Sequence, residues 1–308
     1  MAIKSITATV NGQTVTLTLN ESTGKYEAQL TAPAASSFNL SGGYYPVSVK
    51  AVDTAGNETT ADSNHSTLGE SLRLFVKEQV KPTIEILAPS AGAYVTIGTP
   101  EIRFRVLDNC VQTSGYSGIN KDSCELKIGS SAVAASKITW ETTEGGFIGS
   151  YTPVSALPDG EQSITVDIKD NDGNSAETAS CTFKVDTVAP SLVVTTPTEG
   201  LETNQSELTV TGTTDDVTSK PVVIAVKLNG TDCGAVEVGA DGAFSKTVTL
   251  NQQGGNTIVV TATDKAGKVT SITRTVTYNT TAPVIKSVSI SPNPVNAGNL
   301  YTISVEIE

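Results

Sequence analysis

An alternation of apolar and polar residues recurs three times along the chain, and each copy runs into an Asp-x-x-Gly segment. The three copies are residues 47–57, 164–174 and 258–268. Apolar side chains at every second position turn one face of a strand toward a core, and Asp and Gly are typical of tight turns. The repeat therefore predicts a tandem array of similar β-rich modules rather than one large fold.

Prolines indicate the module boundaries. Pro82, Pro190 and Pro283 each follow one copy of the repeat, at intervals of 108 and 93 residues. This spacing is the size of one β-sandwich domain. We predict an all-β fold of tandem immunoglobulin-like β-sandwiches, with boundaries at 2–80, 81–187, 188–281 and 282–308. The joints before the prolines are short, and proline keeps the residue before it extended, so we expect a semi-rigid array.

The third module shows its strands most clearly. Seven strands are expected, over residues 190–197, 208–213, 222–229, 235–238, 244–250, 257–263 and 271–278. Asn229-Gly230 predicts a two-residue hairpin turn after the third strand. The second module repeats the pattern with strands expected at 84–89, 102–106 and 179–185, and with a longer loop at 108–123. Seven short strands separated by turn residues are typical of an immunoglobulin-like sandwich.

The first module begins in the middle of this pattern. Residues 6–12 correspond to residues 224–230, and residues 24–33 to residues 242–250, so nothing before Ile6 supplies strands one and two. Residues 283–307 have the pattern of those two strands.

We predict that the segment 282–308 completes the first module, because an unfinished sheet exposes edges and an isolated hairpin is only marginally stable. Completion can occur within one chain or by strand donation between chains. The alternatives are a chain cut within a domain, a tail that docks on another protein, or a disordered tail.

The net charge of −12 argues against nucleic-acid and anionic-lipid partners, since no basic patch offsets it. No stretch of 18 apolar residues is present, so no membrane insertion is expected. The first residues also lack the apolar segment of a secretory signal peptide. We interpret the acidic charge as a determinant of solubility, with a cation-binding surface as the alternative.

The four cysteines are Cys110, Cys124, Cys181 and Cys233. Cys110 and Cys124 flank a short loop and have the spacing for a bridge, but without an export signal reduced thiols are favoured. Cys181 lies in an alternating strand and is expected to be a small core residue. No CxxC pair or Cys/His cluster suggests zinc.

The acidic turn residues are Asp53, Asp170, Asp172 and Asp264. Clustered carboxylates in tight loops can bind calcium. The interpretation that we favour is structural, with Asp accepting backbone N–H groups and Gly adopting positive φ. Lys268 in the third copy weakens the calcium interpretation further. We therefore predict no metal site, no cofactor and no catalytic residue.

Four other features have a structural and a functional interpretation. Tyr45 suits a corner tyrosine that bonds back to the backbone, and Gln162 and Asn256 take its place in the later modules. His65, the only histidine, lies in a long polar insert and is expected in a solvated loop. Trp140 is expected to be a partly buried strand aromatic rather than a sugar platform. The loop 112–120 stays open between the two interpretations.

The A-x-D-x-A-G-N turns, the boundary motif at Asp186 to Pro190 and the phrase at 291–298 resemble bacterial Ig-like domains. The whole chain is similar to Ig-like virion proteins encoded by phages and prophages of gut Firmicutes. This resemblance implies a non-enzymatic structural or adhesion protein of a tail or virion surface, released by lysis. Its partners would be copies of itself, other virion proteins and host-surface carbohydrate.

The alternative function is a spacer or adhesion segment of a secreted bacterial cell-surface protein or polysaccharide-degrading enzyme. In that case the chain is a piece of a longer protein located at the cell surface or outside the cell. An enzyme is the third possibility, and no pattern in the sequence favours it.

Overall fold

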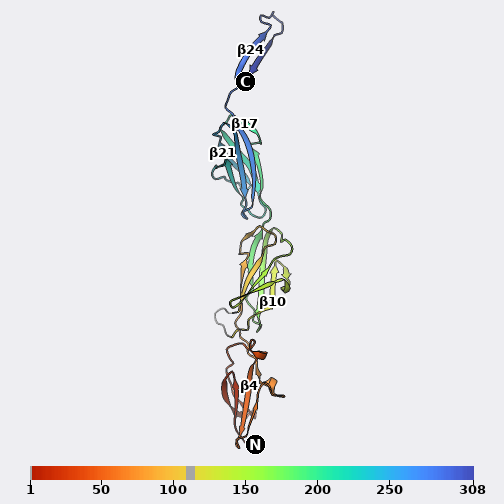
Figure 1. The fold of residues 1–308 in the computed structure, drawn as a ribbon, viewed down its shortest axis with the longest axis vertical. Helices are drawn as coiled ribbons and strands as arrows, with labels where there is room; N and C mark the ends of the chain where they lie inside the picture. The colour runs from red at the N-terminus through yellow and green to blue at the C-terminus, as the bar shows by residue number, and fades with distance from the viewer. Residues whose placement is uncertain (1, 109–114) are drawn as a thin grey trace. The chain divides into compact units, whose positions relative to one another are not determined.

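The computed structural model describes residues 2–108 and 115–308, which are almost entirely β-strand and loop (Figure 1). Only short 3-10 helices interrupt the strands, at Ser41–Gly43, Gly69–Leu72 and Ala135–Lys137. The chain divides into two compact units, Met1–Val185 and Asp186–Glu308.

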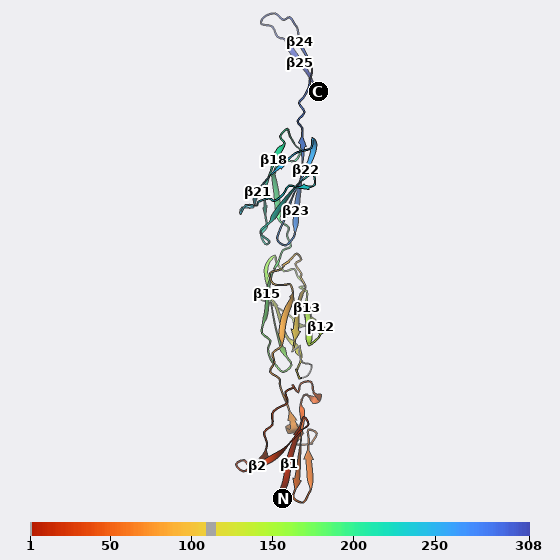
Figure 2. The same cartoon turned by 90° about the vertical axis from the view of Figure 1, so that its left-hand side faces the viewer.

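The second unit contains a two-layer sandwich between residues 191 and 278 (Figure 2). One sheet has the order β16 (Ser191–Thr196), β18 (Glu207–Asp215), β21 (Ala243–Thr249). The other has the order β17 (Leu201–Thr203), β23 (Val269–Tyr278), β22 (Gly254–Thr263), β19 (Val223–Leu228), β20 (Thr231–Asp232). Alternate residues of β22, Ile258, Val260 and Ala262, are fully buried between the layers. The period-2 pattern of the sequence is thus the pattern of core contacts.

Two details of this sandwich differ from the predicted strands. The strand expected at 235–238 is wrong, because only Val238 pairs there, in an isolated bridge with Phe244. Gly234, with φ of 82°, interrupts the extended backbone before it. The short strand β17, which was not predicted, pairs in parallel with β23. The Asn229-Gly230 turn is confirmed, since both residues have positive φ as a two-residue hairpin requires.

The first unit contains the other sandwich, which spans residues 83–185 and is the second module of the sequence. One sheet has the order β12 (Thr139–Thr143), β13 (Gly146–Tyr151), β9 (Ile102–Leu107), β7 (Thr83–Ala88). The other has the order β11 (Ser131–Val133), β10 (Ile119–Ile128), β14 (Gly160–Asp170), β15 (Ala179–Val185), β8 (Tyr94–Val95). Its largest fully buried side chains include Phe104 and Phe183, one from each sheet. Both sandwiches therefore have an apolar core of their own.

The residues before this sandwich form one sheet. Its order is β3 (Lys25–Glu27), β2 (Gln13–Asn20), β1 (Ile3–Val10), β4 (Tyr45–Asp53), β5 (Glu58–Ala61), and β6 (Arg73–Leu74) also pairs with β4. β1 pairs with β4 as β19 pairs with β22, which agrees with the predicted correspondence. Among the described residues of 2–80 no second sheet covers it. Val47, Val49 and Ala51 are accordingly half-buried, whereas their counterparts in the other modules are buried.

The strand expected at 24–33 is much shorter than predicted, because β3 ends at Glu27. Its counterpart β21 is held along its length by β18. Residues 2–80 have no strand that corresponds to β18, so the backbone after Glu27 has no ladder to join.

Residues 285–307 form a separate hairpin of β24 (Ile285–Ser291) and β25 (Thr302–Ile307). Ile285 pairs with Ile307, much as Ser191 pairs with Asp215 in the first two strands of the sandwich of the second unit. Among the described residues β24 and β25 pair only with each other, and every residue of both is exposed. Completion of the first module by this hairpin is therefore not confirmed and stays a prediction.

The fold class is confirmed: this is an all-β protein of tandem immunoglobulin-like modules. Within the described ranges, no helix has the length and apolar character to cross a membrane.

Strand donation between chains can be tested through the apolar face of the hairpin, where Val288 and Ile290 pair with Val305 and Ile303. The variant I290D/I303D should abolish association, because charged side chains cannot cover an apolar sheet face. Light scattering measures the mass of the wild type and the variant over a concentration series. V193D, which places a charge on an exposed valine of β16, is the control. A wild type that stays monomeric at every concentration contradicts donation between chains.

Candidate functional site

The three Asp turns have the predicted local structure. Asp53 Oδ1 accepts hydrogen bonds from the backbone N–H groups of Ala55 (2.8 Å) and Asn57 (2.9 Å). Asp170 and Asp264 each accept the N–H group four residues later, at 2.8 and 2.9 Å. Gly56, Gly173 and Gly267 all have positive φ. The backbone hydrogen bonds and the positive φ values that we predicted for these turns are thus confirmed.

Two of these aspartates have buried acidic neighbours that the sequence analysis did not predict. In the first unit, Glu78, Asp108 and Asp170 bring one carboxylate oxygen each within 4.8 Å of the others. All three side chains are buried. Glu78 comes from the segment that leads into the second sandwich, whereas Asp108 follows β9 and Asp170 ends β14. We call this group cluster 1.

Cluster 1 is surrounded by hydrogen-bond donors that satisfy most of its oxygens. Asn174 donates from its side chain to Asp170 Oδ2 (2.7 Å) and to Glu78 Oε1 (3.2 Å). The backbone N–H of Gly118 donates to Asp108 Oδ2 (2.6 Å). Asp108 Oδ1 is buried and has no hydrogen-bond partner among the described residues. One oxygen of the cluster is therefore left without compensation.

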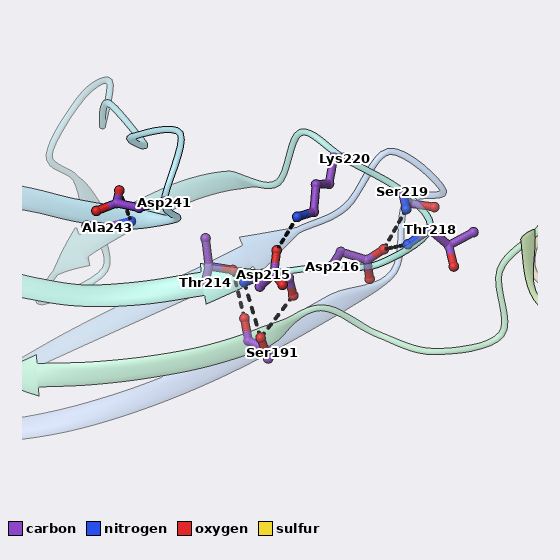
Figure 3. A network of polar contacts seen from close by, with 9 residues as sticks. All are labelled: Ser191, Thr214, Asp215, Asp216, Thr218, Ser219, Lys220, Asp241 and Ala243. Carbon is purple, nitrogen blue, oxygen red and sulfur yellow. Dashed lines mark hydrogen bonds and ion pairs between the residues drawn. The ribbon is translucent and has the colours of Figure 1, made fainter.

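The second unit contains an equivalent group, Asp186, Asp216 and Asp264, which we call cluster 2. Its carboxylate oxygens also lie within 4.8 Å of one another, and all three residues are buried. Asp216 Oδ1 accepts the backbone N–H groups of Thr218 (2.8 Å) and Ser219 (2.5 Å) (Figure 3). The Ser219 hydroxyl donates to Asp186 Oδ2. Asp264 Oδ2 is buried and has no hydrogen-bond partner among the described residues.

The two clusters occupy the same places in their modules. Glu78 and Asp186 lie four residues before Pro82 and Pro190, and Asp108 and Asp216 lie 26 residues after those prolines. The equal spacing of acidic residues around the boundary prolines was the sequence signal that could have revealed the clusters. Asp53, in contrast, belongs to no such cluster in the described part of the chain. Asp172 lies outside cluster 1 and accepts the backbone N–H of Glu78 (2.9 Å).

Seven ion pairs of the described residues join exposed side chains and include none of these carboxylates. Lys220, for example, pairs with Asp215 (2.7 Å) and not with Asp216, the next residue in the sequence (Figure 3). Burial, together with the nearby carboxylates of Asp170 and Asp108, raises the pKa of Glu78 to about 7. Burial likewise raises the pKa of Asp108.

Three of the other features have the structures that we expected. The Tyr45 hydroxyl donates to the backbone carbonyl of Ala35 (3.1 Å), which confirms the corner tyrosine. Gln162 and Asn256 also bond back to the backbone, at the carbonyls of Pro158 (3.0 Å) and Gln252 (2.9 Å). Trp140 is half-buried and packs edge-on against Phe104, so it is a strand aromatic. His65 is exposed in its loop.

The cysteines and the loop 112–120 are only partly described. Cys124, Cys181 and Cys233 are free thiols, and Cys181 is buried as predicted. Cys110 and residues 112–114 lie outside the described residues. In the rest of that loop, the carbonyl of Tyr116 accepts a hydrogen bond from Asn39 (2.8 Å).

Comparisons with known proteins relate the chain to parts of bacterial enzymes. Residues 190–280 match the family model of glucodextranase, domain B. Bacillopeptidase F of Bacillus subtilis (strain 168) is 30% identical over 171 residues, which are 54% of this chain. The match spans only 11% of the length of Bacillopeptidase F.

Three solved structures show distant likeness. The fibronectin(III)-like modules of Clostridium thermocellum CbhA have 17% identity and a TM-score of 0.38, over 64% of this chain and 94% of that chain. A 1.5-MDa bacterial ice-binding adhesin has 20% identity and a TM-score of 0.30, over 91% of this chain and 88% of that chain. Bacteroides ovatus SGBP-B, solved with a mixed-linkage heptasaccharide, has 14% identity and a TM-score of 0.22, over 94% and 66%.

The chain thus consists of Ig-like modules that resemble parts of bacterial enzymes. None of the relatives named above is a virion protein, so the resemblance to phage proteins has no support from them.

The corner tyrosine gives a stability prediction. Tyr45→Phe should lower the free energy of unfolding of the first module by about 1–2 kcal/mol, because the half-buried Ala35 carbonyl loses its donor. Urea unfolding measures this loss. Tyr44→Phe is a matched control, since its ring contacts Phe75 and Arg73 and these contacts need no hydroxyl. Equal effects of the two substitutions would contradict the role of the Tyr45 hydroxyl.

Proposed function

We propose that this chain is a non-catalytic spacer or adhesion segment of a secreted or cell-surface bacterial protein. The observation that carries the proposal is the partial match to Bacillopeptidase F, in which 171 residues correspond to a small part of a much longer protein. The match of residues 190–280 to one domain of glucodextranase has the same character. Modules of one kind that recur beside different catalytic activities are better explained as accessory domains than as sites of chemistry.

The architecture supports this proposal. Each complete sandwich fills its interior with apolar side chains, such as Phe104 in one and Val260 in the other. The buried polar groups are largely at strand ends and turns, where they hold backbone N–H groups. Such modules act through their number, spacing and surfaces. A contact with cell-surface carbohydrate stays a prediction.

The virion protein is the alternative, and it rests on the resemblance carried by the turns and by residues 291–298. In that case the chain would be released by lysis in particles. In the proposed case it would be exported as part of a larger polypeptide. The two functions therefore place the same sequence in different physical fractions.

Fractionation of the source bacterium tests the proposal. Antibodies raised against the third module should detect a polypeptide in the cell wall or the culture fluid, longer than this chain. A cytosolic enzyme serves as the marker for lysis. Particles purified on a density gradient after prophage induction form the second arm. Co-sedimentation of the antigen with those particles, and its absence from the wall and the fluid, would overturn the proposal in favour of the virion protein.

A further inference from the structure

We propose that clusters 1 and 2 each bind one Ca²⁺ ion, so that a chain carries two calcium sites at equivalent positions of its two complete sandwiches. The inference does not depend on the spacer function, because it rests only on the side chains of the clusters.

Charge and burial carry the first step of the argument. Each cluster brings three carboxyl groups together, and none of the six residues is more than 8% exposed. Buried ionised carboxylates are costly unless a cation or a network of donors compensates them. Lys81, near Glu78 in sequence, pairs with Glu177, and Lys220, near Asp216, pairs with Asp215. A bound cation supplies the missing positive charge in both places.

The second step comes from the hydrogen bonds. Asp108 Oδ1 in cluster 1 and Asp264 Oδ2 in cluster 2 lack a hydrogen-bond partner among the described residues, in side chains that are only 5% and 6% exposed. Buried polar atoms are almost always hydrogen-bonded, so each orphan oxygen requires an explanation. A coordinated cation would satisfy both orphan oxygens. Each of them lies in a cluster that offers further oxygen ligands to the same cation.

The third step is the chemistry of the donors. Every candidate ligand atom is an oxygen. In each cluster a buried serine hydroxyl also donates a hydrogen bond to the carboxylate of the leading segment, from Ser117 to Glu78 (3.4 Å) and from Ser219 to Asp186. Carboxylate and other oxygen donors suit hard cations, whereas zinc sites use His and Cys. Three buried carboxylates that lie close together suit Ca²⁺ better than Mg²⁺, because Mg²⁺ keeps several of its water ligands.

The position of the clusters gives such binding a consequence. Glu78 and Asp186 belong to the segments that lead into the sandwiches, whereas the other four carboxylates lie at or directly after the ends of strands of those sandwiches. A cation held by all three carboxylates ties the incoming segment to the module that follows it. Calcium would therefore order the linker residues as well as stabilise the module.

Equilibrium dialysis of the full chain against ⁴⁵Ca²⁺, after removal of metal with chelator, tests the proposal directly. The wild type should bind two ions per chain, with dissociation constants of about 1 mM or below, as in extracellular modules. D264N and D216N should each reduce the number to one, and D170N should do so through the other cluster. D53N is the matched control, because Asp53 has the same turn but no cluster, and it should leave two ions bound.

Melting curves provide the second readout and show whether each variant folds. Saturating Ca²⁺ should raise the melting temperature of both sandwiches by roughly 10 °C. D264N should lose the shift only in the third module, and an equal concentration of Mg²⁺ should not reproduce it. The absence of both binding and shift in the folded wild type would overturn the proposal. Two ions still bound by folded D264N and D216N would overturn it for cluster 2.

Discussion

Each sheet in this chain has one apolar face, and the stability of a module depends on covering that face with a second sheet. In the second module Val166 and Phe104, which come from opposite sheets, are fully buried. Burial of this kind contributes about 25 cal/mol for each Å² of apolar surface. The same inward positions of the first sheet, Val47 and Val49, are only half-buried because residues 2–80 form no second layer over them. The alternation is thus present in all three modules. It stabilises a module fully only where a second sheet buries the apolar face.

The same alternation places the acidic clusters. Along β14 the inward positions run Ile164, Val166, Ile168 and then Asp170, and along β9 they end with Asp108. The two aspartates are therefore the next inward residues beyond the core, on strands of the two opposing sheets. An apolar residue at these positions would extend the core. A carboxylate instead ends it with a charge that faces another charge, and this arrangement demands compensation.

Local patterns predicted the elements whose residues are close in sequence. The Asn229-Gly230 hairpin, the Asp turns and the corner Tyr45 were correct because turn chemistry and period-2 burial act over a few residues. The strand expected at 24–33 failed because its existence depends on a partner strand. The clusters were missed for a similar reason: Glu78 and Asp170 are far apart in sequence and meet only after the two sheets pack. The sequence signal that could have predicted the clusters was the equal distance of the acidic residues from the boundary prolines in both modules.

The residue four positions after the turn aspartate gives the two clusters different hydrogen bonds. Asn174 follows the turn of cluster 1, and its side chain satisfies Asp170 Oδ2. Lys268 takes that position in cluster 2, where its backbone N–H donates to Asp264 Oδ1, and Asp264 Oδ2 has no hydrogen-bond partner in the described part of the chain. At the level of sequence the lysine argues against a cation at this turn. In the structure it removes an amide donor rather than supplying an ion pair, so the carboxylate of cluster 2 keeps more of its capacity for a ligand than that of cluster 1.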